Sequence, residues 1–315
     1  MNKTKSLNIA ICFVMLFTGA IFSQQSFEEH TFVYKIAKGH EIKANIFLPK
    51  NNYNHAVFIY FHGGGFIFGN RDGGLETILR DELLSRGYAV VSADYRLAPE
   101  TKLDGIIEDA RDIVIWMNDN GSKQFNIDAN KIAVAGGSAG GYLAISTGYT
   151  VSPSPKAIIA ISAPTGFTGM KIKEGDKSLL KQHGPYDIVK DTMVSYGNYT
   201  SRVDLWRFLS KNNLSISEIF GFDVSKDTAR LRNYTLTENI KQGYPPILIV
   251  HAKNDYLVDF SQAQKFYNFL QEKKIESELF TVENGHSTEL INNNPDAVEE
   301  IIQYLDAHLN MGTKK

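Results

Sequence analysis

Hydrophobic positions along the chain follow two patterns that alternate. Continuous apolar runs, typical of strands buried on both faces of a sheet, occur at 56–61, 88–93, 132–135, 156–162 and 246–252. Helical spacing of apolar residues lies between or after them, at 76–86, 105–118, 142–149, 261–273 and 295–308. A further strand is expected at 278–282. The alternation predicts an α/β fold, with a mostly parallel central sheet and helices on both of its faces.

Two regions depart from this alternation. Loosely alternating residues at 31–36 and 41–48, separated by Lys38-Gly39, predict a hairpin before the first buried strand. From about 164 to 243 the chain is polar with scattered aromatic residues, and short helices are expected at 205–209 and 217–220. We interpret this stretch as a lid-like insertion over the sheet. The alternative is an ordinary pair of connecting helices.

The N-terminal segment has the layout of a secretory signal peptide. Lys3 and Lys5 precede an apolar run at about 7–22, which is short for a membrane span, and a polar stretch follows. Cleavage after Ser23 is expected, which leaves 24–315 as the mature domain, secreted or periplasmic and without stable membrane insertion. The alternatives are an uncleaved anchor and a lipoprotein signal at Cys12, although Ile11 precedes that cysteine where a small residue is needed.

Composition excludes several classes of chemistry and partner. Cys12 is the only cysteine, so the mature chain is expected to contain no disulfide, thiol nucleophile or cysteine metal site. The formal net charge of −2 gives no electrostatic basis for binding nucleic acid or an anionic membrane. No cofactor or metal is expected, and the oligomeric state stays open.

The candidate nucleophile is Ser138. It lies in Gly136-x-Ser138-x-Gly140, between an apolar strand and a segment compatible with a helix. Strand, sharp turn and helix around G-x-S-x-G form a nucleophile elbow, in which side chains at the glycine positions would collide with the strand and helix. By itself the motif is weak, because a glycine-rich strand-to-helix turn has the same sequence.

A base and an acid are expected at the carboxyl ends of later strands. A serine hydroxyl needs a base to accept its proton, and the base needs a carboxylate to orient it. Asp255 follows the run that ends at 252, and His286 follows the strand expected to end near 282. Both fall in the order Ser, Asp, His of α/β hydrolases. Asp259 is the competing acid, but it is placed to cap the helix that begins near 260.

Glycines after the first buried strand are candidate oxyanion donors. The triple glycine 63–65 lets the backbone approach a substrate closely, so that backbone N–H groups of this loop can bind a developing oxyanion. The N–H of Ala139, at the start of the elbow helix, is a third donor. No Gly-Lys-Ser/Thr follows, which excludes a phosphate-binding P-loop.

Taken together, His62-Gly-Gly-Gly-Phe66, Gly136-Gly-Ser-Ala-Gly-Gly141, Asp255 and His286 resemble the α/β-hydrolase carboxylesterases. The chain is similar to the hormone-sensitive-lipase-type esterases, whose Asp-Tyr-Arg-Leu-Ala-Pro-Glu segment it matches at 94–100, and to the acetyl/feruloyl xylan esterase-like group. The resemblance implies Ser138 as nucleophile, His286 as base, Asp255 as orienting acid, and Gly64, Gly65 and Ala139 as oxyanion donors. Gly137 stands where the lipase-type family usually has an acid, and long N-terminal cap helices are not expected, because the hairpin begins just after the expected signal peptide. Both departures favour the xylan-esterase-like group.

The expected function is therefore a secreted serine ester hydrolase. By analogy with the family, its substrates are short acyl esters, acetyl or feruloyl, of small molecules or of polysaccharides. Two alternatives remain. One is a peptidase of the prolyl-oligopeptidase type, which shares the triad order, although such chains usually carry a large N-terminal propeller and only about 30 residues are expected between the signal peptide and the first core strand. The other is a non-catalytic binding protein with a hydrolase fold.

Overall fold

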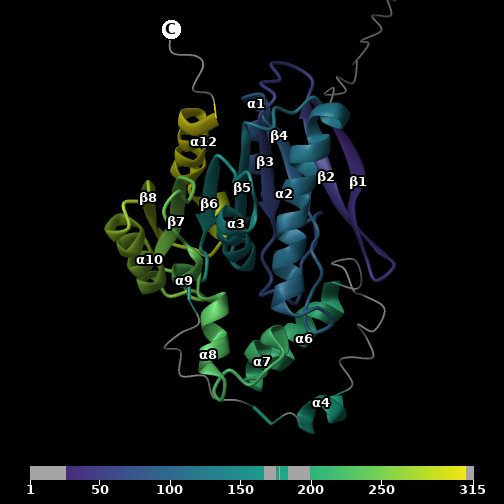
Figure 1. Cartoon of the computed structure of the whole chain (residues 1–315), viewed down its shortest axis with the longest axis vertical. Coiled ribbons are helices and arrows are strands. Elements are labelled where there is room, and N and C mark those ends of the chain that lie inside the picture. Colours follow the sequence, from purple (N-terminus) through teal and green to yellow (C-terminus); the bar gives the residue numbers. More distant parts are fainter. Residues whose placement is uncertain (1–25, 167–174, 177, 184–198, 310–315) are drawn as a thin grey trace, which may run out of the picture.

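Eight strands form one sheet at the centre of the protein (Figure 1). The computed structural model describes residues 26–166, 175–176, 178–183 and 199–309. The expected signal peptide and parts of the expected insertion (167–174, 177 and 184–198) lie outside these residues. The strands are β1 (Phe27–Ala37), β2 (His40–Pro49), β3 (Val57–Phe61), β4 (Ala89–Ala93), β5 (Ile132–Gly137), β6 (Ala157–Ile161), β7 (Ile247–Asn254) and β8 (Ser277–Asn284).

Strand order in the sheet is β1-β2-β4-β3-β5-β6-β7-β8. The hairpin β1–β2 joins the rest through an antiparallel pairing of β2 with β4, and every later pairing is parallel. The predicted mostly parallel sheet is thus confirmed. Because β3, β5, β6, β7 and β8 run in the same direction, their carboxyl ends meet at one edge, where sites of α/β folds lie.

Helices cover both faces of the sheet (Figure 1). One face carries α2 (Leu103–Phe125), α3 (Ala139–Thr150) and α10 (Phe260–Glu272), and the other carries α1 (Thr77–Ser85), α11 (Thr288–Asn293) and α12 (Pro295–Leu309). Successive residues of a strand face opposite sides, so Ile59 belongs to the first core and Phe58 to the second. Burial on both sides explains why these strands appear as continuous apolar runs.

The described part of the insertion is helical. It contains α4 (Ser178–His183), α6 (Tyr199–Lys211), α7 (Ser215–Phe220), α8 (Thr228–Leu231), the 3-10 turn η1 (Arg232–Tyr234) and α9 (Leu236–Asn239). The two short helices expected here correspond to α6 and α7, of which α6 is much longer than predicted. Figure 1 shows these helices below the sheet, beyond the ends of its parallel strands. No helix among the described residues is long and apolar enough to cross a membrane.

Candidate active site

Ser138 lies at the turn between β5 and α3. Its φ of 54° and ψ of −120° are rare for a residue with a side chain, and its N–H donates to the Ile161 carbonyl at 2.8 Å. A Cβ at Gly136 would overlap the Gly140 carbonyl, and one at Gly140 would overlap the Phe61 carbonyl. Glycine is therefore required at both positions. The strand, turn and helix expected around Ser138 are all present.

Asp255 and His286 meet at the ends of β7 and β8. Nδ1 of His286 lies 3.0 Å and 2.8 Å from the two carboxylate oxygens of Asp255, whose side chain is fully buried. The backbone N–H groups of Leu257 and Val258 donate to Oδ1 of Asp255. Burial by itself raises the pKa of Asp255, but these hydrogen bonds outweigh it and hold the pKa below its ordinary value. The carboxylate is thus ionised and fixed in orientation.

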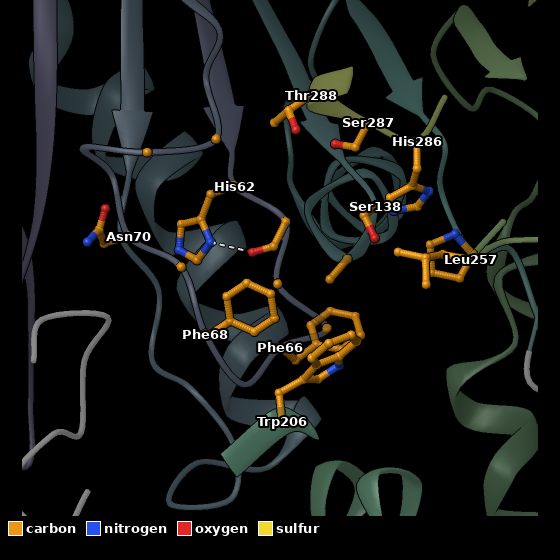
Figure 2. A pocket seen from close by; sticks show the side chains of 18 of the residues that line it. His62, Phe66, Phe68, Asn70, Ser138, Trp206, Leu257, His286, Ser287 and Thr288 are labelled. Carbon is orange, nitrogen blue, oxygen red and sulfur yellow. Dashed lines mark hydrogen bonds between the residues drawn. The ribbon is translucent and has the colours of Figure 1, made fainter. Parts of the chain in front are cut away.

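Ser138 and His286 line the same pocket, and Figure 2 shows the imidazole beside the serine side chain. Among the described residues no hydrogen bond joins Ser138 to His286. Catalytic hydrogen bonds are often long in a free enzyme and tighten when substrate binds. The geometry therefore brings all three candidate residues to one place. Asp255 and His286 are already in contact, whereas His286 and Ser138 are not yet hydrogen-bonded.

Asp259, the competing acid, caps a helix instead. Its carboxylate accepts the N–H of Ser261 in the first turn of α10. His251, a buried residue of β7 that the sequence did not mark as part of the site, lies next to Asp255. Nε2 of His251 is 2.9 Å from the Val258 carbonyl and 3.5 Å from Oδ2 of Asp255. Burial lowers the pKa of His251, although the hydrogen bond to Val258 and the charge of Asp255 act in the opposite direction. The ring packs against the loop that carries Asp255.

The triple glycine forms a tight turn against the elbow. The carbonyl of Gly64 accepts the N–H groups of Ile67 and Phe68, and Gly64 and Gly65 have φ values of 111° and 57°. A Cβ on Gly63 would lie 3.2 Å from the Gly137 carbonyl oxygen, so the turn lies directly on the elbow. Among the hydrogen bonds of the described residues, none uses the N–H of Gly64, Gly65 or Ala139. All three donors are available beside Ser138.

The segment 94–100 braces this turn. The Tyr95 hydroxyl donates to the carbonyl of His62, and the N–H of Ala98 donates to the carbonyl of Phe66, each at 2.8 Å. The segment is itself held by buried ion pairs between Asp94 and Arg71 and between Arg96 and Asp109. The motif matched at the level of sequence thus supports the loop that carries the candidate oxyanion donors.

Asp109 offers a test of this support. Its side chain is fully buried and pairs with Arg96 at 2.7 Å and with Lys35 at 2.8 Å. Asp109→Ala is expected to lower the free energy of unfolding by about 3–5 kcal/mol, because it removes the close carboxylate partner of the buried Arg96. Asp112→Ala, which removes a partly exposed partner of Lys35, is the control and should cost about 1 kcal/mol or less. Urea unfolding measures both, and equal effects would contradict the assignment.

The pocket at this site has a volume of about 850 Å³. Figure 2 shows Phe68 and Trp206 on one side of Ser138 and Ser287 and Thr288 on the other. The aromatic side is completed by Ile216 and Ile219 of α7, so the described insertion supplies one wall. From the sequence, Trp206 is one of the aromatic residues of the insertion that could stack on a sugar, although a core position is favoured for them; the structure places it in the pocket wall. Ser287 was not predicted to belong to the site, and no sequence motif marks it. In the part of the chain that the structure describes, no cluster of three or more His, Cys, Asp or Glu is arranged to hold a metal.

Comparison with known proteins decides the family. A family model described as BD-FAE matches residues 44–270. The chain belongs to the BD-FAE family. Esterase LipI of Mycobacterium tuberculosis is 46% identical over 88 residues, which cover 28% of this chain and 27% of LipI. An arylesterase of Saccharolobus solfataricus is 29% identical over 160 residues, half of each chain.

Much longer proteins contain a similar segment. A non-reducing polyketide synthase of Preussia isomera, Preu6, is 26% identical over an alignment that covers 85% of this BD-FAE chain. The chain spans only 14% of the length of Preu6 and 7% of that of the synthase ascC of Acremonium egyptiacum. These matches therefore compare one part of each synthase with this chain.

Solved structures show the same fold. A protein of unknown function from Staphylococcus aureus superposes with a TM-score of 0.67 at 21% identity, covering 90% of this chain and 99% of its own. A Thermogutta terrifontis esterase, Est2, with butyrate bound superposes with a TM-score of 0.64 at 18% identity, covering 92% and 97%. The expected α/β-hydrolase fold is confirmed, and two of the named relatives, LipI and the Saccharolobus solfataricus protein, are esterases.

Proposed function

We propose that this protein is a serine carboxylic ester hydrolase that acts through Ser138, His286 and Asp255 by way of an acyl-enzyme. The observation that carries the proposal is that the three candidate side chains and the candidate oxyanion donors meet at one pocket. Side chains from the ends of β5, β7 and β8 meet beside three unused backbone N–H donors, around one pocket. This is the set of groups that acyl transfer to a serine needs.

In the first half of the reaction, Nε2 of His286 takes the proton of the Ser138 hydroxyl as Oγ attacks the ester carbonyl carbon. The N–H groups of Gly64, Gly65 and Ala139 bind the resulting oxyanion. Collapse breaks the bond to the alcohol oxygen, which receives the proton from His286, and the acyl-serine remains. Water then attacks the acyl-serine with His286 as base, and the acid and free Ser138 are released. Asp255 stabilises the imidazolium in both halves.

The two sides of the pocket support an orientation for the substrate. Because His286 must protonate the departing alcohol, we place the alcohol on the side of His286 and Ser287, where Thr288 adds a second hydroxyl (Figure 2). The acyl group then lies on the side of Phe68 and Trp206. A polar alcohol side suits a carbohydrate hydroxyl, which supports acetyl or feruloyl esters of polysaccharides as the substrate class.

Trp206 supports a preference for short acyl groups. A Cβ on Gly65 would be 3.1 Å from Nε1 of Trp206, so the indole stands directly on the oxyanion turn. Its helix α6 is anchored by the buried Arg202, which donates to the carbonyls of Ile67 and Ala98 and pairs with Glu100 at 3.0 Å. The indole is therefore a fixed wall close to the reacting carbon.

Trp206→Ala is expected to extend the range of acyl chains. The ratio of kcat/KM for p-nitrophenyl octanoate to that for p-nitrophenyl acetate should rise by about tenfold or more, since each methylene accommodated in an apolar pocket is worth about 1–3 kcal/mol. Trp116→Ala is the matched control, because Trp116 packs against Phe32 outside the pocket. An unchanged ratio in Trp206→Ala would mean that the acyl chain lies elsewhere.

Export is the second part of the proposal. The layout of residues 1–23 supports a signal peptide and a secreted or periplasmic location. Intact-mass measurement of the exported protein should give a chain that begins within a few residues of Gln24. A mass that includes the first 23 residues would favour an uncleaved anchor.

Release of acetate or ferulate from xylan, assayed beside the p-nitrophenyl esters, tests whether polysaccharide esters are substrates.

A further inference from the structure

Ser287, the residue after His286, bridges the two strands on either side of the elbow strand. The sheet order here is β3-β5-β6. The N–H of Ser287 donates to Oγ of Ser162, directly after β6, at 3.0 Å. The hydroxyl of Ser287 is hydrogen-bonded to that of Tyr60 in β3. Ser287 therefore crosses over the end of β5, where Gly137 precedes the nucleophile.

The backbone of this bridge adopts rare conformations. Ser287 has a φ of 50° and Ser162 a φ of 48°, and both residues are buried. Non-glycine residues persist in this region only where surrounding contacts determine the conformation. Here the contacts are the hydrogen bonds just described, together with those of α11, where the N–H of Ile291 donates to the Ser287 carbonyl.

Contact with this bridge also explains Gly137. A Cβ at position 137 would overlap Oγ of Ser287 and lie 2.7 Å from the Tyr60 hydroxyl oxygen. No acidic side chain fits there without displacing both hydroxyls. The hydroxyls of Ser287 and Tyr60 thus occupy the space that an acidic side chain before Ser138 would need.

We propose that Ser287 is a positioning residue for the reaction, which ties the His286 loop to the elbow through Tyr60 and Ser162. His286 is held by Asp255 at Nδ1, but this contact alone leaves its loop able to shift along the sheet edge. The bridge fixes the loop relative to β5, which ends one residue before Ser138, so that Nε2 stays aimed at Oγ. This inference rests on the proposed triad.

Replacing the two hydroxyls tests the bridge. Ser287→Ala and Tyr60→Phe are each expected to lower kcat for p-nitrophenyl acetate by about tenfold to a hundredfold, since small displacements of a catalytic group have effects of that size. KM should stay within about twofold, as expected when only transition-state interactions are lost. Ser146→Ala is the control, because Ser146 is also fully buried but donates within α3 to the Leu143 carbonyl.

A spectroscopic readout separates positioning from folding. The proton of the His286–Asp255 hydrogen bond, observed by NMR, should broaden or shift in Ser287→Ala while the melting temperature stays near that of Ser146→Ala. Unchanged kcat together with an unchanged proton signal would overturn the inference. Loss of kcat only in proportion to lost folded protein would also overturn it. Because Ser138→Ala tests the triad itself, failure of the bridge and failure of the proposed function give different results.

A compensating pair tests the packing explanation. Gly137→Ala alone should lose most activity, because its methyl group displaces Ser287. Adding Ser287→Gly and Tyr60→Phe makes room for that methyl and should restore the melting temperature to the level of the Ser287→Gly, Tyr60→Phe double variant. The kcat of the triple variant should match that of the double variant. A triple variant no more stable than Gly137→Ala would show that position 137 is constrained by something else.

Discussion

Ser138→Ala is expected to reduce kcat for p-nitrophenyl acetate by about 10⁴-fold to 10⁶-fold and to leave the fold intact. The hydroxyl is the atom that becomes acylated, and alanine offers no replacement, so only binding and the oxyanion donors remain to assist attack by water. Alanine and serine pay the same conformational free energy for a φ of 54°, because both carry a Cβ. The melting temperature should therefore change little, and circular dichroism checks this before rates are compared.

Labelling adds an independent measurement to this prediction. A fluorophosphonate should modify the wild-type protein once, at Ser138, and should not modify Ser138→Ala. Ester hydrolysis that persists in the variant would show that another residue is the nucleophile. A folded wild-type protein that neither hydrolyses esters nor reacts with the probe would indicate a binding protein with a hydrolase fold. Cleavage of proline peptides in place of esters would indicate the peptidase alternative.

The central strands were predictable from the sequence because burial on both faces leaves them with few polar positions. All five of the continuous apolar runs are strands, shifted by one or two residues at their ends. Helix ends were less predictable. The helix expected at 105–118 is α2, which continues to Phe125 past Gly121, because Met117 and Ile127 pack around that glycine. Such support comes from residues outside the local pattern.

Helix α11 was missed for a related reason. Its six residues, Thr288–Asn293, are too few to show a period. Its first turn is set by the backbone of Ser287 rather than by a capping side chain. The insertion was recognised by the break in alternation, but α6 begins at Tyr199, well before the apolar residues that suggested it. Polar surface helices over a site carry a weak hydrophobic pattern.

The candidate site was predictable only as far as strand order fixes it. Ser138, Asp255 and His286 each follow a strand, so knowing the strands places them along one edge of the sheet. Residues that act through side-chain packing carry no such signal. Trp206 contacts Gly65 because Arg202 anchors α6, and Ser287 contacts Gly137 because β3 and β6 flank β5. Those contacts depend on three-dimensional neighbours that no spacing in the sequence records.

Asp255→Asn is expected to lower kcat by about 10⁴-fold near neutral pH, a loss of the size known when a triad acid becomes an amide. In the protein, Oδ1 of Asp255 accepts the N–H groups of Leu257 and Val258, and Oδ2 lies 2.8 Å from Nδ1 of His286. An asparagine keeps the two backbone hydrogen bonds through its oxygen. Its amide nitrogen must then face Nδ1 and donate to it.

This exchange of acceptor for donor puts the imidazole in the wrong tautomer. With Nδ1 accepting a hydrogen bond, the proton of neutral His286 sits on Nε2, which can no longer take the proton of Ser138. The control is Asp259→Asn, four residues on. Asp259 caps α10 through the N–H of Ser261, and asparagine caps as well as aspartate. Its activity should stay at the wild-type level, and a similar loss in both variants would contradict the assignment of the acid.

The pH dependence of the free energy of unfolding is a second, independent test of Asp255→Asn. The hydrogen bonds to Asp255 hold its pKa below the ordinary 3.8. An acid whose pKa is lower in the folded than in the unfolded chain stabilises the fold above the unfolded value, and this contribution is lost as the pH falls toward the folded pKa. Asp255→Asn removes that contribution. The free energy of unfolding, measured by urea titration, should therefore fall less between pH 5 and pH 3 in the variant than in the wild type. A steeper fall in the variant would mean that the carboxylate at this position is not the group held ionised by His286.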